Sequence, residues 1–141
     1  MSQPTATARA FVMDDYEKAC ALWCECEGID ICEGDSREEI TGYLARNPRL
    51  SRVVEVDGTL AGAALCGHDG RRAIIYHLAV AQAFRGRGIG KLLLDDCVCA
   101  LQTTGIQRAI ILVADDNSLG HDFWLRNGWE DIEAFAMCRD L

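Results

Sequence analysis

The chain has 141 residues, of which 50% are hydrophobic and 26% are charged, and its formal net charge is −8. This length suits a single domain with a real core, and the composition excludes a disordered or collagen-like chain. The negative charge argues against a general nucleic-acid binder, and no apolar run approaches the ~18–20 residues that a membrane span needs. The N-terminal residues show no basic stretch followed by an apolar one, so we expect a cytoplasmic protein without a secretory signal.

The first half of the chain predicts a strand followed by two helices. Ala8–Val12 is typical of a short strand, and an aspartate just after it can cap a helix over about residues 14–26. Glu27–Asp35 is an acidic loop. Ser36 opens a second helix with the S-x-x-E pattern of a capping box, and that helix ends near Asn47.

The second half of the chain changes to the period of strands. Asp57 and Gly58 form a strong hairpin signal between two of them. The expected elements are strands at Ser51–Val56, Thr59–Cys66 and Ala73–Val80, a helix at Gly88–Thr104, a strand at Ala109–Val113, a helix at Ser118–Asn127 and a strand at Trp129–Arg139. The apolar run at Ala109–Val113 is typical of a strand covered on both faces. The order β-α-α-β-β-β-α-β-α-β predicts a mixed α/β (α+β) fold, with one domain over residues 1–141.

Eight cysteines raise two sharper hypotheses, a disulfide framework and a metal site. A disulfide framework belongs to small secreted chains that lack a core, and the C-x-C spacings here do not match the C-x₂₋₄-C pairs of a zinc site. We therefore expect no metal, and reduced, mostly buried thiols. The cysteines are Cys20, Cys24, Cys26, Cys32, Cys66, Cys97, Cys99 and Cys138.

The stretch from Arg85 to Lys91 carries the clearest chemical signal. It lies between a strand and a helix, and its three alternate glycines let the backbone approach a ligand at the positive end of the helix dipole. It fails the G-x-x-x-x-G-K-[ST] pattern of a Walker loop and fits the G-x-G-x-x-G dinucleotide fingerprint poorly. It meets every position of a third pattern, Q/R-x-x-G-x-G/A after a strand that ends in an apolar-Ala-Val sequence, here Leu78–Val80. We expect a cradle for phosphate.

Together with a second motif, this loop makes the sequence resemble the GNAT superfamily of N-acetyltransferases, as a small bacterial member. The segment from Asn117 to Trp129 is similar to the family's N-x₅-[FL]-Y-x₃-G-[FW] motif, and the two motifs stand in the family's order. The resemblance covers essentially the whole chain. It implies the GNAT acyltransferase fold and the direct transfer of an acetyl group from acetyl-CoA to a primary amine.

The resemblance also implies where the coenzyme binds. The strand Ala73–Val80 would diverge from Ala109–Val113 and open a slot for pantetheine. Backbone groups of Leu78 and Val80 would pair with the pantetheine amides, and the glycine loop would bind the pyrophosphate. The residues implied in coenzyme binding are Leu78, Ala79, Val80, Arg85, Gly86, Arg87, Gly88, Ile89, Gly90, Lys91, Asn117 and Trp124.

The chemistry of acetyl transfer adds further demands. An ammonium must lose a proton before it attacks the thioester, and the oxyanion needs a donor, which the resemblance assigns to the Val80 N–H. Trp124 stands where the family often has a tyrosine acid, so we expect the thiolate to leave without a side-chain acid. Tyr76 could deprotonate the amine through water. His77 has the better-suited side chain, but strand alternation predicts it on the opposite face, and the proton path stays open.

The acceptor amine is not identified by the sequence. By resemblance it would enter beneath the two N-terminal helices, where Trp23 and Glu33 are candidate substrate residues and Glu27 and Asp35 add negative charge. The window from residue 71 to residue 91 has five basic and no acidic residues, so the rest of the chain is strongly acidic and favours a cationic amine. The alternative is an acetyl-CoA-binding sensor with little turnover. A peptide amine and a homodimer are compatible with the sequence.

Overall fold

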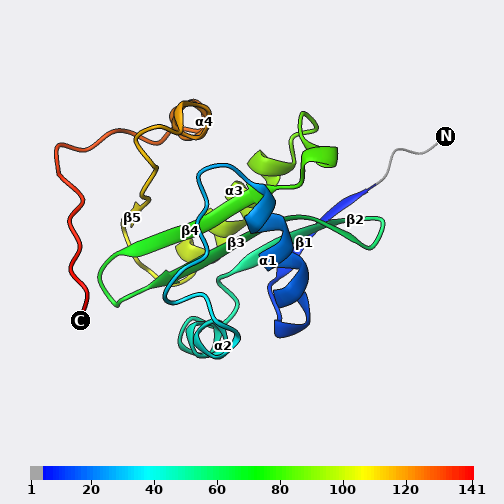
Figure 1. Cartoon of the computed structure of the whole chain (residues 1–141), viewed down its shortest axis with the longest axis horizontal. Helices are drawn as coiled ribbons and strands as arrows, with labels where there is room; N and C mark the ends of the chain where they lie inside the picture. The colour runs from blue at the N-terminus through cyan, green and yellow to red at the C-terminus, as the bar shows by residue number, and fades with distance from the viewer. Residues whose placement is uncertain (1–4) are drawn as a thin grey trace.

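A five-stranded sheet with helices on both faces forms the fold of residues 5–141, the part of the chain that the structure, a computed structural model, describes. The strands are β1 (Ala6–Ala10), β2 (Arg52–Val56), β3 (Thr59–His68), β4 (Ala73–Val80) and β5 (Ala109–Ile110). The helices are α1 (Tyr16–Glu25), α2 (Arg37–Arg46), α3 (Ile89–Gln102) and α4 (Ser118–Arg126). The strands lie in chain order across the sheet, with α1 and α2 on one face and α3 on the other (Figure 1). The predicted mixed α/β fold is confirmed.

Each face of the sheet has its own apolar core. On one face, Val54, Ala64 and Ile75 pack with the apolar side of α3, which contributes Leu93 and Leu94. On the other face the core is built around α1 and α2, with the residues Phe11, Ala19, Leu22, Trp23, Ile40, Val53, Ala63, Leu65 and Ala79. Alternate residues of β2 and β3 thus serve opposite cores, as strand geometry requires.

The N-terminal elements lie close to their predicted positions. β1 begins two residues before the predicted start, and α1 begins after Asp15. The carboxylate of Asp15 does not cap α1, because it accepts two hydrogen bonds of 2.8 Å from Arg9 and one of 2.9 Å from the Val12 N–H. The capping box of α2 is confirmed: the Ser36 hydroxyl accepts from the Glu39 N–H at 3.1 Å, and the Glu39 carboxylate accepts from the Ser36 N–H at 3.3 Å.

The parallel pair of β4 and β5 is very short. Only Ala73 with Ala109 and Ile74 with Ile110 are in register, and the two strands separate beyond that point. The strand predicted over Ala109–Val113 is therefore wrong in its length, and Leu112 is exposed rather than covered. The separation leaves the C-terminal half of β4 with a free edge that faces α4.

A bulge interrupts β4 next to this free edge. Leu65 pairs with Tyr76 and Ala63 pairs with Ala79, so two residues of β4, His77 and Leu78, stand opposite one residue of β3. His77 takes a left-handed backbone with φ of 53°, which is rare for a residue with a side chain. The extra residue breaks the alternation, so the prediction that His77 and Tyr76 face opposite ways is wrong.

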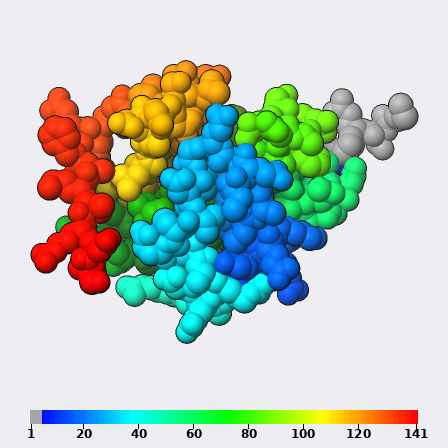
Figure 2. Space-filling view, in the orientation of Figure 1, coloured from blue at the N-terminus to red at the C-terminus, as the bar shows by residue number. Residues whose placement is uncertain are grey.

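The C-terminal segment is the main difference from the predicted fold. No strand forms within the predicted range Trp129–Arg139, and no residue after Asn127 joins the described sheet. The side chains of Phe135 and Met137 are 96% and 92% exposed. Figure 2 shows open space between this segment, in red, and the yellow atoms around β5. An edge strand needs a neighbour to pair with, and the β5 ladder is only two residues long.

The cysteine thiols are less buried than the sequence predicts. All eight cysteines are free thiols, but only Cys66 and Cys97 are buried, so the prediction of mostly buried thiols is wrong. A hydrogen bond with Cys97, together with burial, raises the pKa of the Cys66 thiol well above its ordinary value.

Among residues 5–141, no helix has both the length and the apolar character that crossing a membrane would demand.

Candidate active site

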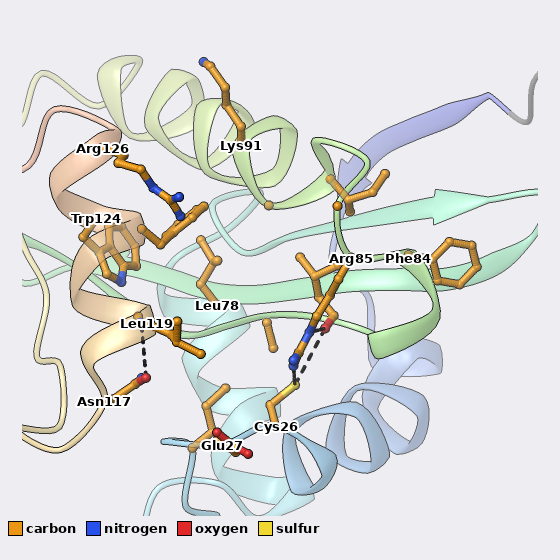
Figure 3. A pocket seen from close by; sticks show the side chains of 18 of the residues that line it. Cys26, Glu27, Leu78, Phe84, Arg85, Lys91, Asn117, Leu119, Trp124 and Arg126 are labelled. Atoms are coloured by element: carbon orange, nitrogen blue, oxygen red, sulfur yellow. Dashed lines mark hydrogen bonds between the residues drawn. The ribbon is translucent and has the colours of Figure 1, made fainter.

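A cleft of about 520 Å³, here called the long cleft, runs along the free edge of β4. It reaches from the glycine loop before α3 to α4, with the end of α1 on its other side (Figure 3). It is lined by Cys26, Glu27, Ile29, Leu78, Ala79, Val80, Phe84, Arg85, Gly86, Gly88, Ile89, Gly90, Lys91, Asn117, Leu119, Gly120, Phe123, Trp124 and Arg126.

The glycine loop presents backbone donors to one end of the long cleft. Gly86 and Gly88 both have φ of 77°, and Gly88 is the residue that precedes α3. The first hydrogen bond of α3 runs from the Leu92 N–H to the Gly88 carbonyl at 3.0 Å, so the preceding N–H groups have no partner inside the helix. A side chain at Gly86 or Gly88 would meet open space, which leaves the backbone accessible to an anion.

Two predicted contributions of this loop differ in the structure. The Arg85 N–H donates to the Gln82 carbonyl at 3.3 Å in a turn, so it is not free for an anion. The Arg87 side chain lies over the Phe84 ring at 5.6 Å and does not line the cleft. Lys91 lines the cleft but pairs with Asp95 at 2.7 Å on the exposed side of α3.

Arg85 crosses the cleft between β4 and α1. Its Nε donates to the Val80 carbonyl at 3.2 Å, and its Nη2 lies 3.6 Å from the Cys26 sulfur (Figure 3). The Ala81 N–H, in contrast, donates to Ala61 of β3 at 2.8 Å. Since successive residues of a strand direct their backbone groups to opposite sides, the N–H and carbonyl of Val80 both face the cleft.

Asn117 fixes the start of α4 beside the same cleft. Its side-chain oxygen accepts from the Gly120 N–H at 3.0 Å and so caps the helix. A Cβ on Gly28 would lie only 2.6 Å from the Asn117 Nδ2, and Gly28 has φ of 80°. The loop after α1 thus approaches Asn117 at a distance that only glycine permits. Trp124 lies on the same helix, with its ring edge-on to Trp129 at 4.9 Å.

A second pocket of about 210 Å³, here called the side pocket, opens between β4, the loop after α1 and the segment after β5. It is lined by Gly28, Ile29, Asp30, Ile75, Tyr76, His77, Leu78, Ile111, Leu112, Val113, Ala114, Asn117 and Trp124. Four residues line both cavities: Ile29, Leu78, Asn117 and Trp124. A ligand in the long cleft and a ligand in the side pocket would therefore meet at this shared wall.

An imidazole and a carboxylate pair at the side pocket. The Nε2 of His77 lies 3.0 Å and 3.1 Å from the two carboxylate oxygens of Asp35, whose side chain is only 8% exposed. The fully buried ring of Trp23 packs against the imidazole at 5.1 Å, and its Nε1 has no partner among the described residues. The Tyr76 ring lies 6.4 Å from the imidazole, on the same face of the sheet.

The structure gathers most of the sequence-predicted site residues. Apart from Arg87, every residue implied in coenzyme binding lines the long cleft, and Tyr76 lines the side pocket. Trp23 lies beneath the side pocket and lines neither cavity, and Glu33 is exposed and lines neither. Sequence reasoning missed the lining residues Cys26, Ile29, Phe84, Leu119, Gly120, Phe123 and Arg126. Phe123 stands at the [FL] position of the motif from Asn117 to Trp129, so a local pattern did mark it. No local pattern marks the other positions, since they become neighbours only when α1 and α4 reach the same edge of β4.

Acetyltransferases are found among the proteins that resemble this chain in sequence and in fold. A sequence profile described as the acetyltransferase (GNAT) family matches residues 10–129. An acetyltransferase of Yersinia pestis (strain Pestoides F) is 34% identical over 109 residues, which are 77% of this chain and 77% of that one. The PaiA N-acetyltransferase of Thermoplasma acidophilum, solved in complex with coenzyme A, superposes with a TM-score of 0.80 at 21% identity and covers 93% of both chains. An aminoglycoside N-acetyltransferase in complex with CoA superposes with a TM-score of 0.76 at 15% identity, over 99% of this chain and 97% of that one.

Proposed function

This chain belongs to the acetyltransferase (GNAT) family, and we propose that it transfers the acetyl group of acetyl-CoA directly to a primary amine that enters through the side pocket. The observation that carries the proposal is the shared wall of the two cavities. One cavity has backbone donors for an anion at its far end, and the other has a histidine and an acidic residue. Two reactants held on either side of one wall are brought into attack geometry, which lowers the entropic part of the barrier.

The residues of the long cleft suit acetyl-CoA along its length. The free N–H groups at the start of α3 suit the pyrophosphate, because they combine unpaired donors with the positive end of the helix dipole. The free edge of β4 at Leu78 and Val80 suits the pantetheine amides, which would pair with it like an added strand. For this pairing, the Val80 carbonyl must exchange its hydrogen bond from Arg85 for one from the coenzyme.

The part of the long cleft where the thioester would react supplies one hydrogen-bond donor and no side-chain acid. The Val80 N–H faces the cleft and can donate to the oxyanion that forms when the amine attacks. Trp124 has an indole N–H that cannot serve as a practical acid, so the thiolate leaves without protonation by a side chain at that position. Tyr76 stays a proposed relay through water, since it lines the side pocket.

Direct transfer is preferred to an acyl-enzyme route. The thiol of Cys26 lines the long cleft and is the nucleophile that an acyl-enzyme would require. Its sulfur lies 3.9 Å from the Val80 carbonyl and 3.6 Å from Arg85, and Cys26 is not one of the four residues of the wall shared with the side pocket. We expect Cys26→Ser to keep its turnover, and mass spectrometry of protein mixed with acetyl-CoA alone to show no acetylated Cys26.

A cationic amine is the acceptor class that the charges favour. Asp30 lines the side pocket and Glu27 lines the adjoining cleft, and both side chains are exposed. Outside residues 71–91 the chain has 22 acidic and only nine basic residues. A negative field raises the local concentration of a cation. The aminoglycoside enzyme with a similar fold acts on an acceptor of this class, which supports the same proposal here.

The experiment is a screen of primary amines for acetyl-CoA-dependent release of CoA, with each product identified by mass. Polyamines, amino acids, aminoglycosides and peptides with a free N-terminus form the panel. Acetyl-CoA well above its Kd should also raise the Tm, because it binds only the folded state. The proposal is wrong if millimolar acetyl-CoA neither stabilises the protein nor loses its acetyl group to any amine. The solution assembly, for which a homodimer stays a prediction, is measured in the same samples by light scattering.

A further inference from the structure

We propose that His77 is the general base that deprotonates the acceptor amine and that Asp35 is the residue that positions it. This inference rests on the proposed function, because a base is needed only if an ammonium must become a nucleophile. It assigns the proton acceptor that the sequence leaves open. It also assigns a role to Asp35, which is contributed by the loop between α1 and α2.

The geometry of the pair determines which nitrogen is available. Both oxygens of Asp35 lie within 3.1 Å of the His77 Nε2, and a carboxylate can only accept, so Nε2 carries the hydrogen. The neutral imidazole then has its lone pair on Nδ1, which makes no hydrogen bond to any of residues 5–141. Asp35 itself is held by the Cys32 N–H at 3.1 Å. The pair is thus arranged to accept one proton and to stabilise the resulting imidazolium.

The backbone of His77 is held in a strained conformation. A left-handed backbone is strained for a residue with a side chain, and such strain clusters at functional sites. The bulge gives β4 one residue more than its pairing with β3 requires, and that residue is His77 or its neighbour Leu78. Without the bulge, β4 could pair with β3 in unbroken alternation, but it would have no imidazole in the side pocket.

The location of the imidazole matches the path of an amine. His77 lines the side pocket and is adjacent in the chain to Leu78, one of the four residues of the shared wall. An amine that lies between the two would be within reach of both Nδ1 and a thioester at the wall. Asp30 is the carboxylate of the same pocket and suits a second positive charge on the acceptor.

Of the titratable groups around His77, only Asp35 forms a hydrogen bond to its imidazole, and Tyr76 stays a proposed relay through water. Tyr76 is beside it on β4, and Tyr43 of α2 packs edge-on against Tyr76 at 6.4 Å. Burial raises the pKa of Tyr43 well above its ordinary value, so it remains a neutral hydroxyl. The Tyr16 hydroxyl of α1 donates to the Asp35 carbonyl at 2.7 Å, not to its carboxylate. From the segment after β5 and from α4, the side pocket receives only apolar residues and Asn117.

The proposed reaction consumes one ammonium and one acetyl-CoA and releases one proton. The bound ammonium gives one proton to the His77 Nδ1, and the neutral amine then forms a bond to the thioester carbon. The tetrahedral adduct breaks its carbon–sulfur bond, and the second proton of the new amide nitrogen passes through water to the departing CoA thiolate. His77 releases its proton to solvent. The products are the acetylated amine, CoA with its thiol and one proton.

The test compares two amines of nearly equal size, ethylamine and 2,2,2-trifluoroethylamine. Ethylamine is an ammonium near neutral pH, whereas fluorine substitution leaves the second amine largely neutral, so only the first needs a base. We expect His77→Gln to lower kcat/KM for ethylamine by about 100-fold or more and for trifluoroethylamine by about threefold or less. Asp35→Asn should lower only the ethylamine value, by about tenfold, and should shift the acidic limb of its pH profile. Equal losses for both amines, or none, would overturn the proposal.

Two controls separate a chemical role from a structural one. His121→Gln removes a half-buried histidine of α4 that lines neither cavity, and it should leave both rates unchanged. Each variant should keep the wild-type Kd for acetyl-CoA, since the long cleft does not include His77 or Asp35. A His77→Gln protein that loses acetyl-CoA affinity as well would assign His77 to packing and contradict the proposal.

A measurement without any acceptor keeps this inference distinct from the proposed function. Nitrogen-15 NMR of the free protein reads the tautomer of His77 directly. We expect the neutral ring to carry its hydrogen on Nε2, whether or not either amine is acetylated. A hydrogen on Nδ1 of the neutral ring would sink the inference even in an active enzyme. An absence of CoA release with every amine would instead defeat the proposed function.

Discussion

The long cleft and the side pocket are built in different ways, although they share a wall. At one end, the long cleft is built from the glycine loop, in which Gly86, Gly88 and Gly90 line the cavity, and from the free edge of one strand. The side pocket depends on side chains, among them His77, whose partner Asp35 lies behind the lining and is 42 residues away in the chain. Backbone recognition constrains which positions must be glycine, whereas side-chain recognition can change with a single substitution. We therefore expect the first cavity to fix the coenzyme and the second to fix the acceptor.

The strongest test of a backbone-built cavity is a side chain placed in the glycine loop. Gly88→Glu should lower the affinity for CoA by about 100-fold or more, because a carboxylate would occupy the anion cradle and displace hydrogen bonds worth roughly 1.5–3 kcal/mol each. Isothermal titration calorimetry measures the change.

Gly105→Glu is the matched control for Gly88→Glu. Gly105 follows α3 at its other end, has φ of 81° against 77° for Gly88, and also has no atom within 4 Å of a built Cβ. It therefore suffers the same backbone strain away from the cleft, and its CoA affinity should stay within about twofold of the wild-type value. Similar losses in both variants would mean that strain, not the cradle, controls binding.

Asn117 tests whether the shared wall uses a side chain to bind the coenzyme. Asn117→Asp keeps an oxygen to cap α4 but removes the amide donor, while Asn117→Ala removes both. We expect both to weaken acetyl-CoA binding about tenfold and only the alanine variant to lose about 1 kcal/mol of unfolding free energy. Chemical denaturation and calorimetry separate the two effects. Wild-type affinity in Asn117→Asp would restrict this residue to capping.

Trp124→Tyr tests whether the reacting end lacks an acid that it needs. The change places a phenol where the family often has one, at a residue that lines both cavities. If the thiolate leaves unaided, kcat should change by no more than about threefold. A gain of 100-fold would instead favour the alternative of a sensor with a decayed site. Steady-state assays with the best acceptor from the amine screen provide the measurement.

The smallest effect is expected outside both cavities, where His121 of α4 pairs with Asp131 at 2.6 Å. The hydrogen bond with Asp131 raises the pKa of His121 above its ordinary value. A raised folded-state pKa means that the contact stabilises the fold below the ordinary value and is lost as pH rises through the raised value. Cleavage of the C-terminal segment by added protease should therefore be slower at pH 6 than at pH 8.

Asp131→Asn is the control for this pH effect. It keeps a side chain of the same size but removes the charge, and CoA affinity should not change in either protein. The segment after Asp131 should then be cleaved at the same rate at both pH values. A pH dependence that survives in Asp131→Asn would assign the effect to another group.

The difference between a cavity built from a local backbone segment and one built from distant side chains also determines which features the sequence could predict. The glycine loop and the capping box are local patterns, so spacing alone located one end of the long cleft and the start of α2. The pair of His77 with Asp35 depends on a bulge that shifts the facing of β4, and a strict alternation of residues predicted the wrong face. The prediction of a strand at Trp129–Arg139 is wrong for a related reason. Whether residues 129–139 pair as a strand depends on how far β5 follows β4, which no local pattern reports.

The bulge in β4 has a consequence for how such a site arises or disappears. Because two residues there oppose one of β3, a deletion of one residue at this point would restore the regular register and return Leu65, Tyr76, Ala63 and Ala79 to unbroken alternation. Both cores would keep their side chains, and only the imidazole beside Asp35 would be lost. One additional residue in β4, rather than a change of residue type, thus places the proposed base beside Asp35. The sheet could fold without that residue. Insertions and deletions, which substitution-based comparisons of related chains overlook, are therefore a route by which this scaffold can gain or lose its chemistry.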